Sequence, residues 1–187
     1  MASPVRIVLD PGHGGRDAGA RGPDGLREAD LTLELARGAA RRLARYPAEV
    51  RLTRQDDRDV ALAERVALAN DWGADLFVSV HCNAASNQRA RGLESYVHPA
   101  AGPCTHAFRR IIHGTLMLYL APLGVPDRGM KKADFYVLRR TRCPALLLEC
   151  LFLTNAADRA LLGDATGRDG LANEIAWALA VATGLAG

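Results

Sequence analysis

The chain has 187 residues, of which 49% are hydrophobic, and its formal net charge is +3. This length predicts one domain with a sizeable core, and the composition argues against intrinsic disorder. With 24 basic and 21 acidic residues, the charge balance gives no support to a nucleic-acid-binding protein. The sequence has no apolar stretch long enough for a transmembrane segment, and we expect no signal peptide within the residues before the first predicted strand.

The apolar pattern alternates between strands and helices along the whole chain. Strands are predicted at residues 5–9, 49–53, 76–80, 93–97, 135–138 and 145–148, with 93–97 near an edge of the sheet. Helices are predicted at residues 29–45, 60–72, 105–120, 156–162 and 171–182, and Gly73 is the expected end of the second helix. This order predicts an α/β fold, in which a largely parallel central sheet is flanked by helices.

Titratable residues stand where several predicted strands end. Asp10 and His13 follow the first strand, His81 follows the third, and Glu149 ends the last. Glu28 lies at the start of the first helix, where its charge could simply favour a helix N-terminus. Each histidine also has a structural alternative, as part of a turn or a strand end. Glu149, however, lies between apolar residues on both sides, and a buried carboxylate without a partner is unfavourable.

Two histidines and one carboxylate are a common ligand set for catalytic zinc. Three protein ligands leave a fourth position for water, and zinc lowers the pKa of that water toward neutrality. A second carboxylate nearby can take the proton of the water and pass it to a leaving amine. The helical HExxH pattern is absent, so these ligands would come from separate loops. The spacing favours a zinc site over a purely structural role.

The four cysteines, Cys82, Cys104, Cys143 and Cys150, form no CxxC pair. Their spacing does not indicate a zinc ribbon, and we expect mostly buried, reduced thiols. A thiol enzyme built on Cys82 or Cys150 is an alternative that lacks a paired catalytic pattern.

Five blocks of the sequence carry a resemblance to a known family. They are DPGHGGRDAGARG, READLTLELA, VRLTRQDDRDVALAERVALAN, DLFVSVHCNA and DRGMKKADFYVLRRTRCPALLLECLFLTN. In this order they resemble the zinc-dependent N-acetylmuramoyl-L-alanine amidases of the Amidase_3 type, over residues 5 to about 180. The resemblance implies one catalytic domain over residues 1–187, with a core at about 5–183 and no separate wall-binding domain. It also implies a twisted, mostly parallel sheet similar to that of zinc exopeptidases.

The resemblance implies a role for each titratable residue. His13, Glu28 and His81 would hold Zn²⁺, and Glu149 would be the catalytic carboxylate. The bond cut by the family is the amide between N-acetylmuramic acid and the L-alanine that begins the stem peptide of peptidoglycan. The glycines beside His13 are expected to leave room for metal and glycan. Asp10 is expected either to accept a hydrogen bond that orients the imidazole of His13 or to stabilise the turn.

Basic residues in the fifth block are candidates for binding the stem peptide. Arg128, Lys132 and Arg139 could pair with its carboxylates, and the alternative is that they are solvated surface charges.

Two positions depart from the family pattern. Leu151 stands where glycine is frequent, and Cys82 stands where alanine is frequent. Because adjacent strand residues point to opposite faces, we expect Cys82 to point into the core.

Other functions remain open at this point. A zinc peptidase acting on a different amide and an inactive wall-binding module are the two alternatives. The expected partner is peptidoglycan, through both its glycan strand and its stem peptide, and we expect a monomer without nucleic acid or a transmembrane segment. Acting on the cell wall, the chain could be a phage lysin, a mother-cell lysin or the catalytic part of an exported enzyme.

Overall fold

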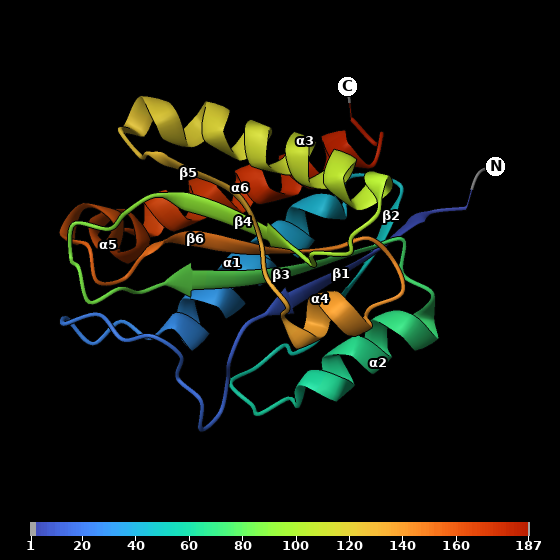
Figure 1. Cartoon of the computed structure of the whole chain (residues 1–187), viewed down its shortest axis with the longest axis horizontal. Coiled ribbons are helices and arrows are strands. Elements are labelled where there is room, and N and C mark those ends of the chain that lie inside the picture. Colours follow the sequence, from blue (N-terminus) through green and yellow to red (C-terminus); the bar gives the residue numbers. More distant parts are fainter. Residues whose placement is uncertain (1–2, 187) are drawn as a thin grey trace.

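A six-stranded sheet lies at the centre of the protein in the computed structural model, which describes residues 3–186 (Figure 1). In sheet order the strands are β2 (Ala48–Leu52), β1 (Val5–Pro11), β3 (Leu76–Asn83), β6 (Ala145–Phe152), β4 (Leu93–Val97) and β5 (Asp127–Lys132). The helices are α1 (Glu28–Leu43), α2 (Leu62–Trp72), α3 (Pro103–Leu120), α4 (Tyr136–Arg140), α5 (Ala156–Gly163) and α6 (Ala165–Ala182), with a short 3₁₀ turn at Ala121–Leu123. The predicted α/β architecture is confirmed.

The sheet is parallel except for one pair of strands. β1 pairs in parallel with β2 and β3, β3 with β6, and β4 with β5, whereas β4 and β6 are antiparallel. The carboxyl ends of β1, β3 and β6 therefore lie at one edge of the sheet. Because β4 runs the other way, its first residues reach the same edge, and so do those of β5. This edge is the one at which the sequence places its titratable residues.

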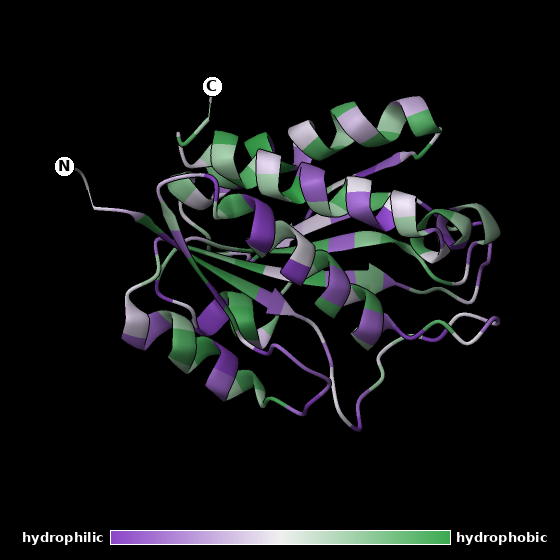
Figure 2. Ribbon diagram, turned by 180° about the vertical axis from the view of Figure 1, so that it is seen from behind, coloured by the Kyte–Doolittle hydropathy of each residue, from purple (hydrophilic) through white to green (hydrophobic). Residues whose placement is uncertain are grey.

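Helices cover both faces of the sheet. α1, α3 and α6 pack on one face over the larger hydrophobic cluster, while α2 and α4 cover the other face over a smaller one (Figure 1). The apolar side of α1, predicted from its periodicity, is fully buried, with Leu31, Leu35, Ala39 and Leu43 in the larger cluster. Figure 2 shows the strands of the sheet as mainly hydrophobic ribbons between helices that carry polar residues outward. Apolar burial on both faces is the main stabilising term of such a fold.

Two elements differ from the prediction in type, and α6 begins at Ala165, six residues before the predicted start at residue 171. Residues 135–138, predicted as a strand, are the N-cap and the first three residues of the short helix α4, and the edge strand β5 was not predicted. The apolar run of 135–138 is too short to separate a helix from a strand by periodicity. β5 consists of Asp-Arg-Gly-Met-Lys-Lys, and only its backbone pairing with β4 makes it a strand.

Gly73 ends α2 in a left-handed conformation, as predicted. Within residues 3–186, the structure has no helix of the length and apolarity that membrane spanning requires.

Candidate metal centre

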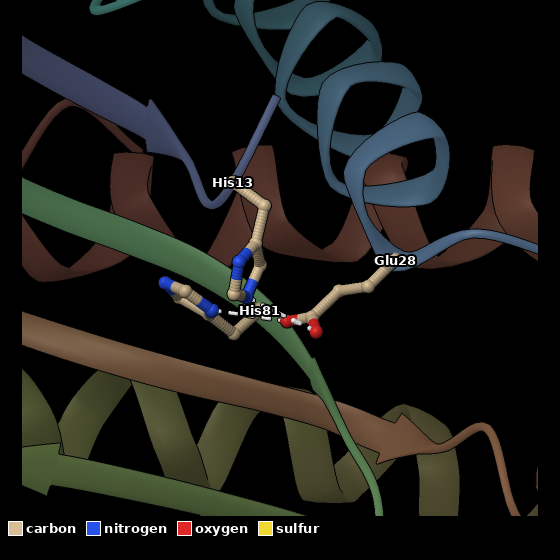
Figure 3. Close-up of side chains that lie close together, drawn as sticks. All are labelled: His13, Glu28 and His81. Atoms are coloured by element: carbon tan, nitrogen blue, oxygen red, sulfur yellow. Dashed lines mark hydrogen bonds and ion pairs between the residues drawn. The ribbon is translucent and has the colours of Figure 1, made fainter. Parts of the chain in front are cut away.

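His13, Glu28 and His81 meet at the edge of the sheet (Figure 3). One ligand atom from each residue lies within 4.8 Å of the ligand atoms of the others. Nε2 of His13 is 3.1 Å from Oε2 of Glu28, and Nδ1 of His81 is 3.0 Å from Oε1. The two imidazole rings stand edge to face, with centroids 4.9 Å apart. Two imidazole nitrogens and one carboxylate, converging from three separate segments, form a donor set that fits zinc.

The carboxylate of Glu28 is held by backbone groups as well as by the histidines. Glu28 is the first residue of α1, and its Oε2 accepts a hydrogen bond from the N–H of Ala20 at 2.8 Å. Its Oε1 accepts one from the N–H of Cys82 at 3.0 Å. Burial acts to raise the pKa of Glu28, but the hydrogen bonds with His13 and His81 outweigh it and hold that pKa well below its usual range. Glu28 is therefore an anion at neutral pH.

His13 has a strained backbone that its surroundings hold in place. Its φ angle is 60°, in the left-handed region that few residues other than glycine adopt. Nη2 of the buried Arg65 donates to the carbonyl of His13 at 2.8 Å, and Nδ1 of the imidazole lies 2.8 Å from Oδ2 of Asp17. The hydrogen bond with Glu28 raises the pKa of His13 to about 9 against the opposing effect of burial. Because Nδ1 contacts Asp17, Nε2 is the nitrogen that faces Glu28.

Of the two expectations for Asp10, the one that it orients the imidazole of His13 is wrong, because Asp17 is the partner of Nδ1. Asp10 is buried, and its oxygens accept hydrogen bonds from Thr53, Ser79 and Arg65 at 2.6, 2.7 and 2.7 Å. Arg65 in turn donates to the carbonyl of His13, so Asp10 acts on the backbone of the ligand loop through that arginine. The physical reason is direction, because Asp10 lies within β1 and pairs in register with Ser79 of the next strand.

A second buried arginine, which sequence reasoning missed, ties the same loop to α1. Arg54 is 0% exposed, and its Nη2 donates to the carbonyls of Gly12 and Ala29 at 2.9 and 2.7 Å. Its Nε donates to the carbonyl of Pro11 at 3.1 Å. These carbonyls belong to the segments that carry His13 and Glu28. The available signal was an arginine directly after the predicted strand 49–53.

The glycines near His13 make room for side chains of the site. A Cβ atom on Gly12 would lie 2.3 Å from the ring of His81, and one on Gly19 would lie 2.5 Å from Oε2 of Glu28. Both are distances that real Cβ atoms do not adopt. Gly14 and Gly15 instead pack against the loop of residues 54–59, so they do not open space for metal and glycan as expected.

Glu149 lies directly opposite His81 across β3 and β6, and it lines the same cavity as the three clustered residues. Its Oε2 is buried and has no hydrogen-bond partner within residues 3–186. Burial raises the pKa of Glu149 to about 7. A buried, unpartnered carboxylate oxygen beside a zinc-type donor set fits a position next to a metal-bound water.

The cavity itself has a volume of about 420 Å³, with a polar floor and an apolar wall. His13, Glu28, His81 and Glu149 form the floor. The wall includes Leu62, Phe135, Tyr136, Val137 and Leu147. Leu62, the first residue of α2, is 53% exposed although it is apolar. Its exposure places an apolar side chain at the opening of the cavity.

The three basic candidates lie in different places. Arg128 is near the start of β5, at the same edge of the sheet as Glu149, and donates from Nε to Glu94. Lys132 ends β5 and lies about 13 Å further along the strand. Arg139 pairs with Asp134 and lines a separate cavity. These positions argue against a contact of Lys132 or Arg139 with a substrate bound at His13, and only Arg128 stays a candidate.

The buried cysteines and Leu151 complete the surroundings. The thiols of Cys82 and Cys150 lie in the larger hydrophobic cluster, and burial raises the pKa of each. That environment disfavours the thiolate which a cysteine nucleophile needs.

Leu151 has a φ angle of 72°, within an irregularity of the β3–β6 pairing that follows Glu149. This left-handed conformation explains why glycine suits the position better than leucine.

Comparisons with known proteins give a family match and similar sequences. A sequence profile of the family Amidase_3, described as N-acetylmuramoyl-L-alanine amidase, matches residues 7–181. The amidase CwlM of Bacillus licheniformis is 42% identical over 82% of this chain and 59% of its own length. The endolysin of Bacillus phage SPP1 is 38% identical over 91% of this chain and 61% of its own length. The chain thus spans about 60% of the length of these two relatives.

The fold is similar to that of a solved amidase. The crystal structure of an N-acetylmuramoyl-L-alanine amidase from Clostridium difficile 630 matches with a TM-score of 0.92 and 31% identity. The match covers 100% of both chains.

Proposed function

This chain belongs to the N-acetylmuramoyl-L-alanine amidase family, and from that premise we propose that it is a zinc-dependent hydrolase of peptidoglycan. The bond cut is the amide between N-acetylmuramic acid and the L-alanine of the stem peptide. The observation that most supports this proposal is the unpartnered Oε2 of Glu149, which shares a cavity with His13, Glu28 and His81. A purely structural carboxylate would have its hydrogen bonds satisfied.

In this proposal His13, Glu28 and His81 hold the metal, and Glu149 moves the proton. Bound zinc would polarise the scissile carbonyl and lower the pKa of a coordinated water. Glu149 accepts a proton from the attacking water and delivers it to the alanine nitrogen as the carbon–nitrogen bond breaks. The products are the lactyl carboxylic acid and a stem peptide with a free amino group. A pKa near 7 suits a group that acts first as a base and then as an acid.

The remaining groups of the cavity support binding. The apolar wall of Leu62, Phe135 and Tyr136 would cover the methyl groups next to the scissile bond and exclude bulk water. Since all four site residues come from one chain, we propose that it acts as a monomer. One relative is a phage endolysin and another is a sporulation-specific amidase. We therefore propose cell-wall degradation as its role, either as an endolysin or as an autolysin.

The test is the chemical identity of the product. Purified peptidoglycan is digested, and the released fragments are analysed by mass spectrometry. We expect stem peptides with a free N-terminal L-alanine, loss of release with a chelator, and recovery on adding Zn²⁺. Fragments that begin at another residue would overturn the assigned bond. Full activity in protein shown by metal analysis to be metal-free would overturn the zinc proposal, and binding to the wall without any release would identify a binding module.

A further inference from the structure

A second buried carboxylate lies beside Glu149. Glu94 on β4 is 2% exposed and pairs in register with Glu149 across the antiparallel β4–β6 pair. Its Oε1 accepts from Nε of Arg128 at 2.6 Å and from Nζ of Lys131 at 2.5 Å. Its Oε2 accepts from the hydroxyl of Tyr96 at 2.6 Å and from Nδ2 of Asn83 at 3.1 Å. We call Glu94, Arg128, Lys131, Tyr96 and Asn83 the Glu94 cluster.

The Glu94 cluster has a net charge of one positive unit. Glu94 supplies one negative charge, whereas Arg128 and Lys131 supply two positive charges. Within residues 3–186, neither cation makes an ion pair with any other carboxylate. Glu149 lies opposite Glu94, but within residues 3–186 it makes no hydrogen bond or ion pair with either cation. The cluster therefore presents a net cation next to the cavity, which favours an anionic group of a ligand.

Arg128 is the member whose geometry fits a carboxylate. Its Nε is used by Glu94, and its guanidinium carbon lies 4.8 Å from the centroid of the Phe152 ring. These two contacts fix both the plane and the direction of the guanidinium group. Nη1 and Nη2 donate to no residue within 3–186, and the side chain is 35% exposed. The planar end of an arginine with two such nitrogens binds a carboxylate through two parallel hydrogen bonds.

The register of the strands gives the spacing along the sheet between Glu149 and Phe152, the residue that Arg128 contacts. Phe152 pairs with Asn83, which lines the cavity, while Glu149 pairs with His81. Two residues along a strand, from His81 to Asn83, span about 7 Å. One residue of an extended peptide spans about 3.4 Å. A stem peptide whose first amide lies at Glu149 would thus bring its second residue to Arg128.

We propose that Arg128, positioned by Glu94 and Phe152, binds a free carboxylate on the second residue of the stem peptide. This inference rests on the proposed function and adds to it a preference among stems. A carboxamide at the same position carries no charge, and its NH₂ group would face the N–H groups of Arg128. The chain therefore discriminates stems with a free second-residue carboxylate from stems in which that group is amidated. Glu94 is a positioning residue in this scheme.

The test uses two synthetic muropeptides that differ only in that group, one with the α-carboxylate and one with the α-carboxamide on the second stem residue. For the wild-type chain we expect a KM about tenfold lower for the carboxylate, with similar kcat for both. Arg128→Ala should raise KM for the carboxylate substrate to that of the amide while kcat stays within about twofold. Arg128→Lys should recover part of the preference, because it keeps the charge but not the fork.

Matched controls separate this role from a structural one. Arg37→Ala removes an exposed arginine from the opposite helical layer and should leave the preference intact. Glu94→Gln should weaken the preference without changing the metal content, because Glu94 holds Arg128 and is not one of the clustered residues His13, Glu28 and His81. Equal KM values of the wild type for both substrates, or an undiminished preference in Arg128→Ala, would overturn the inference. Cleavage of neither substrate would instead contradict the proposed function.

Discussion

Glu94 and Glu149 lie opposite each other on neighbouring strands, yet their surroundings differ sharply. Burial acts to raise the pKa of both. For Glu94, hydrogen bonds from Lys131, Tyr96 and Arg128 outweigh burial, and its pKa is lowered. For Glu149 nothing outweighs burial, and its pKa is raised to about 7. The comparison teaches that hydrogen-bond donors can outweigh burial: Glu94, with four donors, is a fixed anion, whereas Glu149, whose Oε2 has none, can exchange a proton.

The largest expected difference between the two carboxylates is in catalysis. Glu149→Gln keeps the shape of the side chain but cannot accept a proton, so kcat should fall by about a thousandfold. Zinc content should stay at the wild-type level, because His13, Glu28 and His81 are unchanged. Muropeptide turnover and metal analysis on the same preparation check both statements. Glu49→Gln, on an exposed carboxylate of β2, is the control. Near-normal turnover in Glu149→Gln would refute its assigned role.

The next difference is in how stability depends on pH. The pKa of Glu149 is about 7 in the folded protein and 4.5 as its ordinary value, so the folded state binds the proton more tightly. Its contribution to stability is complete below pH 4.5 and is lost as the pH rises through 7. With chelator present, the free energy of unfolding of Glu149→Gln should therefore equal that of the wild type near pH 4. At pH 8 it should be larger than that of the wild type by up to about 3 kcal/mol. Urea unfolding at several pH values measures this gap, and a constant gap would count against the raised pKa.

The opposite sign is expected at Glu94. Glu94→Gln leaves Arg128 and Lys131 without their carboxylate, so the free energy of unfolding should fall by about 2 kcal/mol at pH 7. The loss stays below the full value for a buried pair, because both cations are partly exposed and can turn toward water. Chemical unfolding of both glutamine variants in one buffer provides the measurement. A stabilised Glu94→Gln would show that the cluster is not held by its carboxylate.

The smallest effect concerns the backbone that follows Glu149. Leu151→Gly and Leu151→Ala both remove a buried side chain, but only glycine relieves the left-handed conformation. The glycine variant should therefore be about 1 kcal/mol more stable than the alanine variant. At Leu148, on the regular part of β6, the order should be reversed, with alanine the more stable. Thermal or urea unfolding of the four variants decides it, and the same order at both positions would exclude strain at Leu151.

Elements with a clear period were predictable from the sequence, and elements set by their neighbours were not. The buried side of α1 follows from apolar residues three and four apart, and Glu149 was conspicuous between apolar neighbours. β5 is polar and takes its strand form from β4, while α4 is too short to show a helical period. The partner of the His13 imidazole is Asp17, whereas the sequence suggested Asp10. This contact depends on how the loop after β1 folds, which no periodic pattern shows.

The sequence by itself determined the α/β class and showed titratable residues at strand ends, because strand ends and polar residues in apolar runs are local features. The choice of His13, Glu28 and His81 as the donor set came from the resemblance to a known family. The tertiary structure alone decided how those residues are supported. The antiparallel β4 brings Glu94 opposite Glu149, and buried Arg54 and Arg65 fix the loop that carries His13. Register and side-chain direction depend on strands far apart in the chain, so no local pattern encodes them.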